Sequence, residues 1–399
     1  MQNDQKNKKV LILILGSMTA LSPFAIDMYL PAFQSIATDL DATIAQISLS
    51  LSSYFIGLSG GQLIYGPLLD RFGRKRPLYV GLLIFIIAAL FCLFSETTTS
   101  LIAWRFIQAI GGCAAGVASM TMVRDHFTVK ESAKVYSLLI LILGASPLLA
   151  PTIGGYLAAA FGWHSIFMVL AVMGLLLLTA VKFFLQESHK PDPTVILKPG
   201  PIFRNFISVL KEAQFYTYAF SAAIAFSGLF VYLAGSPIIF LDNFGVSGQV
   251  YGWIFAIVAA GLIGASQFNV LLLRQFTNQQ LVLAALCAQV LIAVVFLIGT
   301  NLGWFGLSGT VFMFFLFLCC FGLTNPNAGA LALAPFSKNT GSAAALLGFF
   351  QMGIGALASS MIGIFDIKSL LPIVAIMAGS SSTALVILLW GRNRLAKAG

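Results

Sequence analysis

Two ionisable residues lie deep inside long apolar stretches of this 399-residue chain. Asp27 lies in the first stretch and Arg105 in the fourth, and they are the only acid and base placed in this way. A charge in hydrocarbon is costly, so an ionisable group there indicates a functional site such as a proton relay or an ion pathway. The pair therefore favours chemistry in which a carboxyl group takes up and releases a proton inside a membrane.

The two side chains are expected at matched depths. The first stretch ends near residue 32 and the fourth begins near residue 100, so Asp27 and Arg105 each lie roughly 8 Å inside the helices. Burial disfavours a charged carboxylate, whereas a nearby guanidinium favours it, and the balance could swing as water or substrate enters. Three readings stay open: a static ion pair, a structural Arg105 beside a titrating Asp27, or both residues taking part in transport.

Candidate residues for a substrate cavity are few and mostly neutral. At helical spacing, Arg105, Gln108, Gly112, Ala115 and Ser119 share one face with no bulky apolar residue among them. The apolar stretches of the second half of the chain contain no acid or base. The cavity candidates are Tyr29, Gln108, Ser236, Asn325, Asn327 and Gln351. A mainly apolar cavity with a few polar groups suits bulky lipophilic compounds better than sugars or phosphates.

The elements that must position these residues are membrane-spanning helices. The chain is 59% hydrophobic and 9% charged, far below the roughly one quarter charged residues of a soluble domain. About twelve stretches are long enough to span a bilayer, which takes about 20 residues. They lie near residues 9–32, 43–67, 78–95, 99–121, 133–159, 164–185, 213–237, 249–271, 279–299, 304–328, 341–363 and 369–391. The prediction is an all-α polytopic membrane protein, because lipid leaves a continuous apolar run no other way to satisfy its backbone.

One polar stretch divides the spans six and six. It contains several prolines and charges. We therefore predict a six-helix bundle over residues 1–185, a linker over 186–212 and a second six-helix bundle over 213–399. Two such halves are typical of transporters built from structural repeats, with the site near the midplane between them.

Charge placement predicts the orientation. Of the 22 Lys and Arg, all but Arg105 and Lys368 fall at the same face when the N-terminus is placed on that face. The positive-inside rule then puts both termini in the cytoplasm. This asymmetry accounts for the net charge of +9 without nucleic-acid binding. No group of Cys or His has the spacing of metal ligands, so no metal is expected.

The loop between the second and third spans carries the most specific motif. It reads Gly66-Pro-Leu-Leu-Asp70-Arg71-Phe-Gly73-Arg74-Lys75-Arg76. The two glycines permit a tight turn and close approach, and the acid can hold the basic cluster or cap a neighbouring helix. Every position matches the signature loop of the major facilitator superfamily, G-x-L-x-D-R-x-G-R-K-R, which this chain resembles.

Further motifs extend the resemblance over nearly the whole chain. The fourth span contains Arg105-Phe-Ile-Gln108-Ala-Ile-Gly111-Gly112. The fifth span is similar to the antiporter motif of twelve-span drug:proton exchangers, with Ser146 and Ala150 in place of two glycines. The residues of that motif are Ser146, Pro147, Ala150, Pro151, Gly154 and Gly155. Runs such as Ala25-Ile-Asp27-Met-Tyr29-Leu-Pro31 resemble the bicyclomycin-resistance (Bcr/CflA) branch of these exchangers.

The resemblance implies a gate at the cytoplasmic face. An ion network there would hold the outward-facing state, and the fifth span would seal the space between the halves. The gate residues expected from the motif are Gly66, Asp70, Arg71, Gly73, Arg74, Arg124 and Asp125.

The function expected from the resemblance is proton-coupled efflux of lipophilic, drug-like molecules by alternating access. Asp27 and Arg105 would carry the proton coupling, and the proton gradient would replace any cofactor. The expected partners are the lipid of a bacterial inner membrane, protons and small lipophilic substrates, with the protein as a monomer. Two alternatives remain, an exporter of an endogenous amino-acid derivative or peptide and an uptake symporter. An enzyme is not expected, because the three His residues lie near membrane edges and no nucleophile constellation accompanies them.

Overall fold

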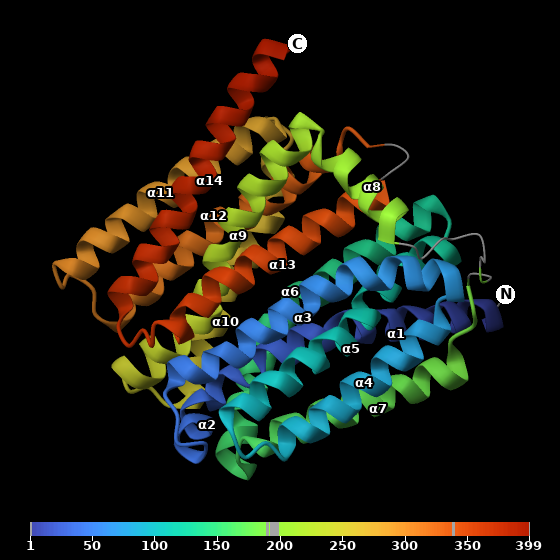
Figure 1. Ribbon diagram of the computed structural model, residues 1–399, viewed down its shortest axis with the longest axis horizontal. Coiled ribbons are helices and arrows are strands. Elements are labelled where there is room, and N and C mark those ends of the chain that lie inside the picture. Colours follow the sequence, from blue (N-terminus) through green and yellow to red (C-terminus); the bar gives the residue numbers. More distant parts are fainter. Residues whose placement is uncertain (1, 189–190, 192–198, 337–339, 399) are drawn as a thin grey trace.

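The structure, a computed structural model, describes residues 2–188, 191, 199–336 and 340–398. Twelve long helices make up most of these residues (Figure 1). They are α1 (Gln2–Asp27), α3 (Ile44–Phe72), α4 (Lys75–Leu93), α5 (Thr98–His126), α6 (Val129–Phe161), α7 (His164–Phe184), α9 (Ala213–Pro237), α10 (Gly248–Leu272), α11 (Asn278–Asn301), α12 (Leu307–Leu333), α13 (Thr340–Ile364) and α14 (Leu370–Ala398). Shorter elements are η1 (Leu30–Ala32), α2 (Phe33–Asp39), α8 (Pro199–Leu210) and η2 (Ile238–Asn243). The predicted all-α class is confirmed.

Eleven helices within the described residues are long and apolar enough to cross a membrane. Large apolar side chains such as Ile87, Leu176 and Leu291 are exposed on the outer faces of α4, α7 and α11, as lipid contact requires. The chain is therefore an integral membrane protein.

Helix α3 is the long helix that does not meet the apolar criterion, although it covers the stretch predicted over residues 43–67. It carries several serines, of which Ser48, Ser50 and Ser52 are buried. The Ser48 and Ser50 hydroxyls donate to carbonyls three residues earlier in the helix. A helix this polar is tolerated because neighbouring helices cover it, with α5 on one side and α13 on the other.

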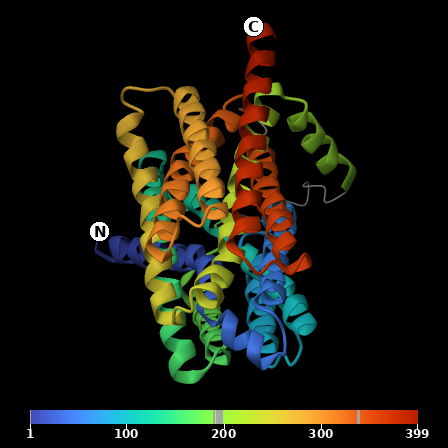
Figure 2. The same cartoon turned by 90° about the vertical axis from the view of Figure 1, so that its left-hand side faces the viewer.

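The helices of residues 2–184 pack mainly among themselves, and so do those of residues 213–398. In both views the first group (blue to green) lies mainly below the second (yellow to red), and the end of α14 projects beyond its neighbours (Figures 1 and 2). We call these groups the first half and the second half. The pairs α3–α13 and α6–α10 join the halves. The domain boundaries at residues 186 and 212 stay predictions.

The helix ends define two sides of the molecule. The linker side holds the turn between α3 and α4, the end of α5 and α8; the far side holds η1, α2, η2 and the loop between α13 and α14. On the linker side, Gly73 has a φ of +82°, which an L side chain adopts at a cost, so glycine permits the sharp turn there. On the far side, Thr43 and Gln46 form a capping box that starts α3.

Candidate functional site

Arg105 is fully buried inside the first half and is held by neutral groups. Its Nη2 donates to the carbonyl of Ala25 on α1 at 2.8 Å, and its Nη1 donates to Oε1 of Gln108 at 2.6 Å. The guanidinium also lies 4.3 Å from the ring centroid of Tyr29 and 4.2 Å from that of Tyr54. Such desolvated cation–π contacts stabilise a buried cation without a carboxylate. Arg105 therefore fixes the end of α1 against α5.

Two of the predicted cavity residues belong to this arrangement. The Tyr29 hydroxyl shares a hydrogen bond of 3.0 Å with Ser50, and its ring packs against Phe167. Gln108 is fully buried, and its Nε2 has no hydrogen-bond partner among the described residues. Both side chains support Arg105 in this conformation, so they do not line an open cavity.

Asp27 is not paired with Arg105 among the described residues. Its side chain is buried, with 4% of the residue exposed, and it is the last residue of α1. Among the described residues, no ion pair or hydrogen bond joins it to Arg105. Residues 25 and 27 point about 200° apart around a helix, so a guanidinium bound at Ala25 lies on a different face from the Asp27 carboxyl. The static ion pair is therefore not the arrangement of this structure.

Two tyrosines of the second half, Tyr232 on α9 and Tyr251 on α10, are near enough to the Asp27 carboxyl to interact with it electrostatically. Among the described residues, no hydrogen bond joins either hydroxyl to Asp27. The Tyr251 hydroxyl shares a hydrogen bond of 2.8 Å with Ser236, a predicted cavity residue. The buried Tyr232 hydroxyl has no hydrogen-bond partner among the described residues. Nothing in the sequence singled out Tyr251, because an apolar pattern does not show which side of a helix packs against the other half.

Aromatic rings surround these tyrosines. The Tyr232 ring packs against Phe255 and Phe314, with centroids 5.7 and 4.9 Å apart, and the Tyr251 ring lies 6.3 Å from that of Phe240. Tyr232 and Tyr251 therefore belong to a mainly aromatic surface of the second half.

The remaining cavity candidates form a separate cluster nearer the linker side. Asn327 donates to Asn269 at 2.6 Å, and Gln351 donates to Asn325 at 2.9 Å. These amides lie toward the linker-side ends of α10, α12 and α13, whereas Ser236 lies at the far-side end of α9. The predicted set is thus divided between two places, and the amides largely satisfy one another across helices.

The antiporter motif on α6 lies against the end of α1 and against α10 of the second half. An ideal Cβ added to Gly154 would lie 2.6 Å from the carbonyl carbon of Met28, just after Asp27. At Gly155 it would lie 2.7 Å from the carbonyl oxygen of Gly248, on α10 of the second half. Only glycine permits both approaches. Of the other motif residues, Pro147 and Pro151 lie inside the helix, Ala150 is buried, and the Ser146 hydroxyl donates to a carbonyl one turn earlier.

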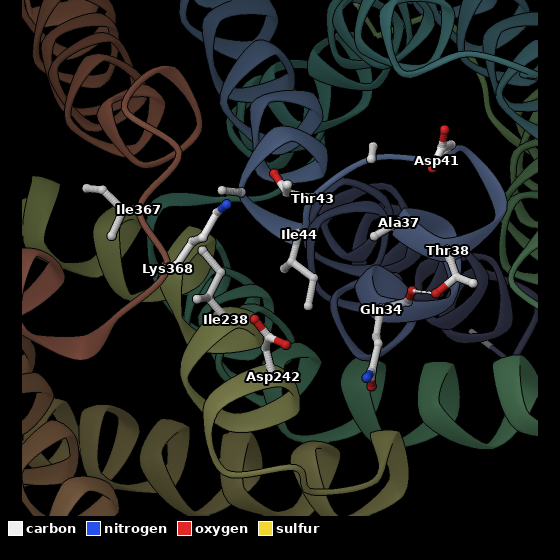
Figure 3. A pocket seen from close by; sticks show the side chains of 12 residues that line it. Gln34, Ala37, Thr38, Asp41, Thr43, Ile44, Ile238, Asp242, Ile367 and Lys368 are labelled. Carbon is white, nitrogen blue, oxygen red and sulfur yellow. Dashed lines mark hydrogen bonds between the residues drawn. The ribbon is translucent and has the colours of Figure 1, made fainter.

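The far side is also closed by polar contacts between the halves. Thr43, at the start of α3, donates to Asp366 at 2.7 Å, and Asp366 lies 2.9 Å from Nζ of Lys368. We call Thr43, Asp366 and Lys368 the far-side latch. Hydrogen bonds from Thr43 and Lys368 lower the pKa of Asp366. The latch borders a cavity of about 500 Å³, into which Asp242 of η2 also points (Figure 3).

The linker side carries an ion network centred on Arg74. Arg74 donates through Nε to Asp125 at 2.9 Å and through Nη1 to Asp70 at 2.6 Å. Its backbone N–H donates to Glu187 at 2.8 Å, a linker residue that the sequence did not single out. Burial alone would lower the pKa of Arg74, but the hydrogen bonds to the two aspartates outweigh it and raise that pKa.

Three of the predicted gate residues, Asp70, Arg74 and Asp125, therefore meet. Gly73 supplies the turn between α3 and α4, and Arg71 lies 5.8 Å from the ring centroid of Phe72. Gly66 lies in α3 with open space beside it. The side chain of Arg124 lies outside the described residues.

A match to the Major Facilitator Superfamily covers residues 15–360 of the chain. Among curated proteins, the chain is 33% identical to YdgK of Bacillus subtilis, an uncharacterized MFS-type transporter, over 93% of this chain and 92% of the relative. It is 32% identical to a bicyclomycin resistance protein homolog of Haemophilus influenzae over 94% of each chain. It is 30% identical to the multidrug resistance protein MdtL of Escherichia coli, over 90% of this chain and 93% of the relative.

Two solved structures share the fold at low sequence identity. A D-xylose-proton symporter superposes with a TM-score of 0.76 at 14% identity, over 95% of this chain and 96% of the other. A bacterial homolog of the human lysosomal transporter Spinster superposes with a TM-score of 0.69 at 15% identity, over 96% of this chain and 95% of the other. These likenesses establish the fold alone.

Proposed function

Because this chain belongs to the Major Facilitator Superfamily of membrane transporters, we propose that it exports lipophilic, drug-like molecules in exchange for protons by alternating access. The names of two relatives, a bicyclomycin resistance protein homolog and a multidrug resistance protein, support export of such compounds. The aromatic surface of Tyr232, Phe255 and Phe314 is the kind of lining that suits a bulky apolar substrate.

One observation carries the proton coupling. Asp27 is a buried acid at the boundary between the halves, and among the described residues no cation pairs with it. Burying this carboxyl group as an anion costs far more free energy than burying it as a neutral acid. Its protonation therefore responds to the conformation around it. Arg105 then acts as a positioning residue, since it holds α1 through the carbonyl of Ala25. The energy source is the proton gradient, with no cofactor.

The orientation follows from charge. We place the linker side in the cytoplasm, with both termini there, in the bacterial inner membrane and with the protein as a monomer. The basic residues of the α3–α4 turn, including Arg74 and Lys75, lie on the linker side, whereas Lys368 lies on the far side. This distribution agrees with the positive-inside rule. The closed far side then faces outward, and the structure corresponds to a state closed to the outside.

Transport by Asp27→Asn tests the proposal. Asparagine is close to a permanently neutral aspartic acid in shape, so the variant should fold but lose substrate-dependent proton flux in proteoliposomes with an imposed pH gradient. Asp41→Asn is the matched control, because Asp41 is exposed on the far side and its φ of +49° suits asparagine. Undiminished coupling in Asp27→Asn would remove Asp27 from the mechanism. Inside-out vesicles also give the direction of transport, since an uptake symporter would run the other way.

A further inference from the structure

Two amide side chains of the second half are partly exposed, although they lie deep in membrane-spanning helices. Asn325 precedes the linker-side end of α12 at Leu333, and Gln351 follows the linker-side start of α13 at Thr340. At 1.5 Å per residue, the two positions lie roughly 12 and 16 Å inside the helices. An amide exposed to hydrocarbon at this depth is costly. The two side chains therefore border a space inside the protein, on the linker side of the closed far side.

The two amides bond to each other and leave one donor and one acceptor unused. Nε2 of Gln351 donates to Oδ1 of Asn325 at 2.9 Å. Among the described residues, Nδ2 of Asn325 and Oε1 of Gln351 have no hydrogen-bond partner. The neighbouring amide pair differs, because Asn327 is buried and donates to both Asn269 and the carbonyl of Leu323. Asn325 and Gln351 therefore present a free N–H and a free carbonyl oxygen side by side.

A column of aromatic rings begins next to this amide pair. Phe321 lies one turn before Asn325 on the same face of α12, and its ring stacks on that of Phe226 of α9, with centroids 4.9 Å apart and planes inclined by 24°. Phe226 is partly exposed, whereas Phe230, one turn closer to the far side, is 2% exposed and packs edge-on against Phe226. The Phe230 ring in turn meets that of Phe55 of the first half at 4.1 Å. The accessible part of the column therefore ends at the contact between Phe55 and Phe230.

An aromatic face beside one donor and one acceptor is complementary to a particular chemical group. A secondary amide on a planar ring offers an N–H to Oε1 of Gln351, a carbonyl oxygen to Nδ2 of Asn325 and a ring face to Phe226. An ester of the same shape lacks the N–H and leaves the Gln351 oxygen unpaired. Ligand sites commonly combine an apolar lining with a few placed polar groups of this kind.

We propose that Phe226, Phe321, Asn325 and Gln351 form a substrate subsite for aromatic amides, in which the amide group pairs with Asn325 and Gln351 and the ring stacks on Phe226. The inference rests on the proposed function, because it names a substrate class for that exporter. The subsite receives its ligand from the linker side, since the far side is closed in this state. Asn325 and Gln351 set specificity, whereas Phe226 provides affinity for any planar ring.

Binding of two matched probes to the purified full-length protein tests the subsite. N-methyl-2-naphthamide and methyl 2-naphthoate are neutral and nearly identical in shape, but only the amide donates a hydrogen bond. Isothermal titration calorimetry should give the amide a Kd lower by roughly 2- to 13-fold, the effect of one neutral hydrogen bond. Gln351→Leu should make the two Kd values about equal. Phe226→Leu should weaken the binding of both probes and preserve their ratio, because stacking does not distinguish an amide from an ester.

Gln289→Leu is the matched control for Gln351→Leu. Gln289 is a fully buried amide of α11, and neither its oxygen nor its nitrogen has a partner among the described residues, so the variant should fold and keep both Kd values. Equal Tm values for the two variants show that Gln351→Leu is folded as well.

Three results overturn the subsite: no binding of either probe, equal Kd values in the wild type, or a ratio that survives Gln351→Leu. Undiminished affinity in Phe226→Leu refutes the stacking. The wild-type comparison needs no variant, so a misfolded variant does not rescue the proposal. If Gln351→Leu equalises the two Kd values but the amide drives no proton flux in wild-type proteoliposomes, the subsite stands and the proposed exchange fails for this class of compound.

Discussion

Gly155→Ala should hinder closure of the far side. In the closed state the added methyl carbon would lie 2.7 Å from the carbonyl oxygen of Gly248 on α10, whereas an ordinary contact is about 3.5 Å. The backbones of α6 and α10 must therefore separate by roughly 1 Å, and no rotamer change can relieve the clash. Overpacking of this kind costs about 1 to 3 kcal/mol.

The clash exists in the closed state alone, which makes its effect on the conformational equilibrium calculable. Alanine also stabilises the helix relative to glycine, but it does so equally in both conformations and does not shift their ratio. A cost of 1 to 3 kcal/mol moves that ratio toward the open state by about 5- to 150-fold. Efflux should fall accordingly, because the cycle must pass through the closed state.

Spin labels on exposed Ser35 of α2 and Asn243 of η2 measure this shift by double electron–electron resonance, in a full-length variant without the five native cysteines. The matched control is Gly264→Ala on α10, where an added Cβ meets nothing within 4 Å. We expect the control to keep the wild-type distance distribution and Gly155→Ala to show the longer distance. An unchanged distribution in Gly155→Ala would refute the claim that the approach of α6 to α10 limits closure.

Two further predictions concern the ends of the molecule. Thr43→Val removes the hydrogen bond that joins the halves at the far-side latch. Because this bond is partly exposed to solvent, we expect the closed population, measured with the spin labels at Ser35 and Asn243, to fall only about threefold. The pKa of Asp366 is lowered below its ordinary value of 3.8, so the latch should stay intact above about pH 4 and weaken only as the pH falls below that value. A fall in the closed population near pH 6 that Thr43→Val abolishes would contradict this prediction. Arg74→Gln should lower the Tm of the purified protein by several degrees, because the largely buried Asp125 loses a charge-assisted donor of about 1.5 to 3 kcal/mol and the half-exposed Asp70 loses one of at most about 1 kcal/mol. Arg76→Gln, at an exposed position, should leave the Tm unchanged. Equal Tm values for the two variants would show that the linker-side network contributes no stability.

The contacts between the halves are distributed unevenly. On the far side, backbone approaches at Gly155 and Gly248 and the latch at Thr43 join the two halves. On the linker side, the partners described for Arg74 belong to the first half and the linker. Opening toward the cytoplasm can therefore leave the Arg74 network intact, and that network stabilises the first half as one body.

Local sequence determined the parts of this protein that depend on few neighbours. Apolar runs of about 20 residues fix helices in a membrane because the backbone must bond to itself. The cluster of Asp70, Gly73 and Arg74 also follows from sequence, since the acid and the base lie four residues apart around a glycine turn.

Tertiary structure alone decided which groups face Asp27. Depth along a span can be counted from the sequence, but the direction of a side chain depends on where the helix ends and how it is rotated against its neighbours. Helix α1 ends at Asp27, and Arg105 binds the carbonyl of Ala25, while Tyr232 and Tyr251, more than 200 residues later in the chain, lie within electrostatic reach of the carboxyl. Contacts across that separation arise when two helical bundles dock, because packing of whole surfaces, and no local pattern, sets their relative position.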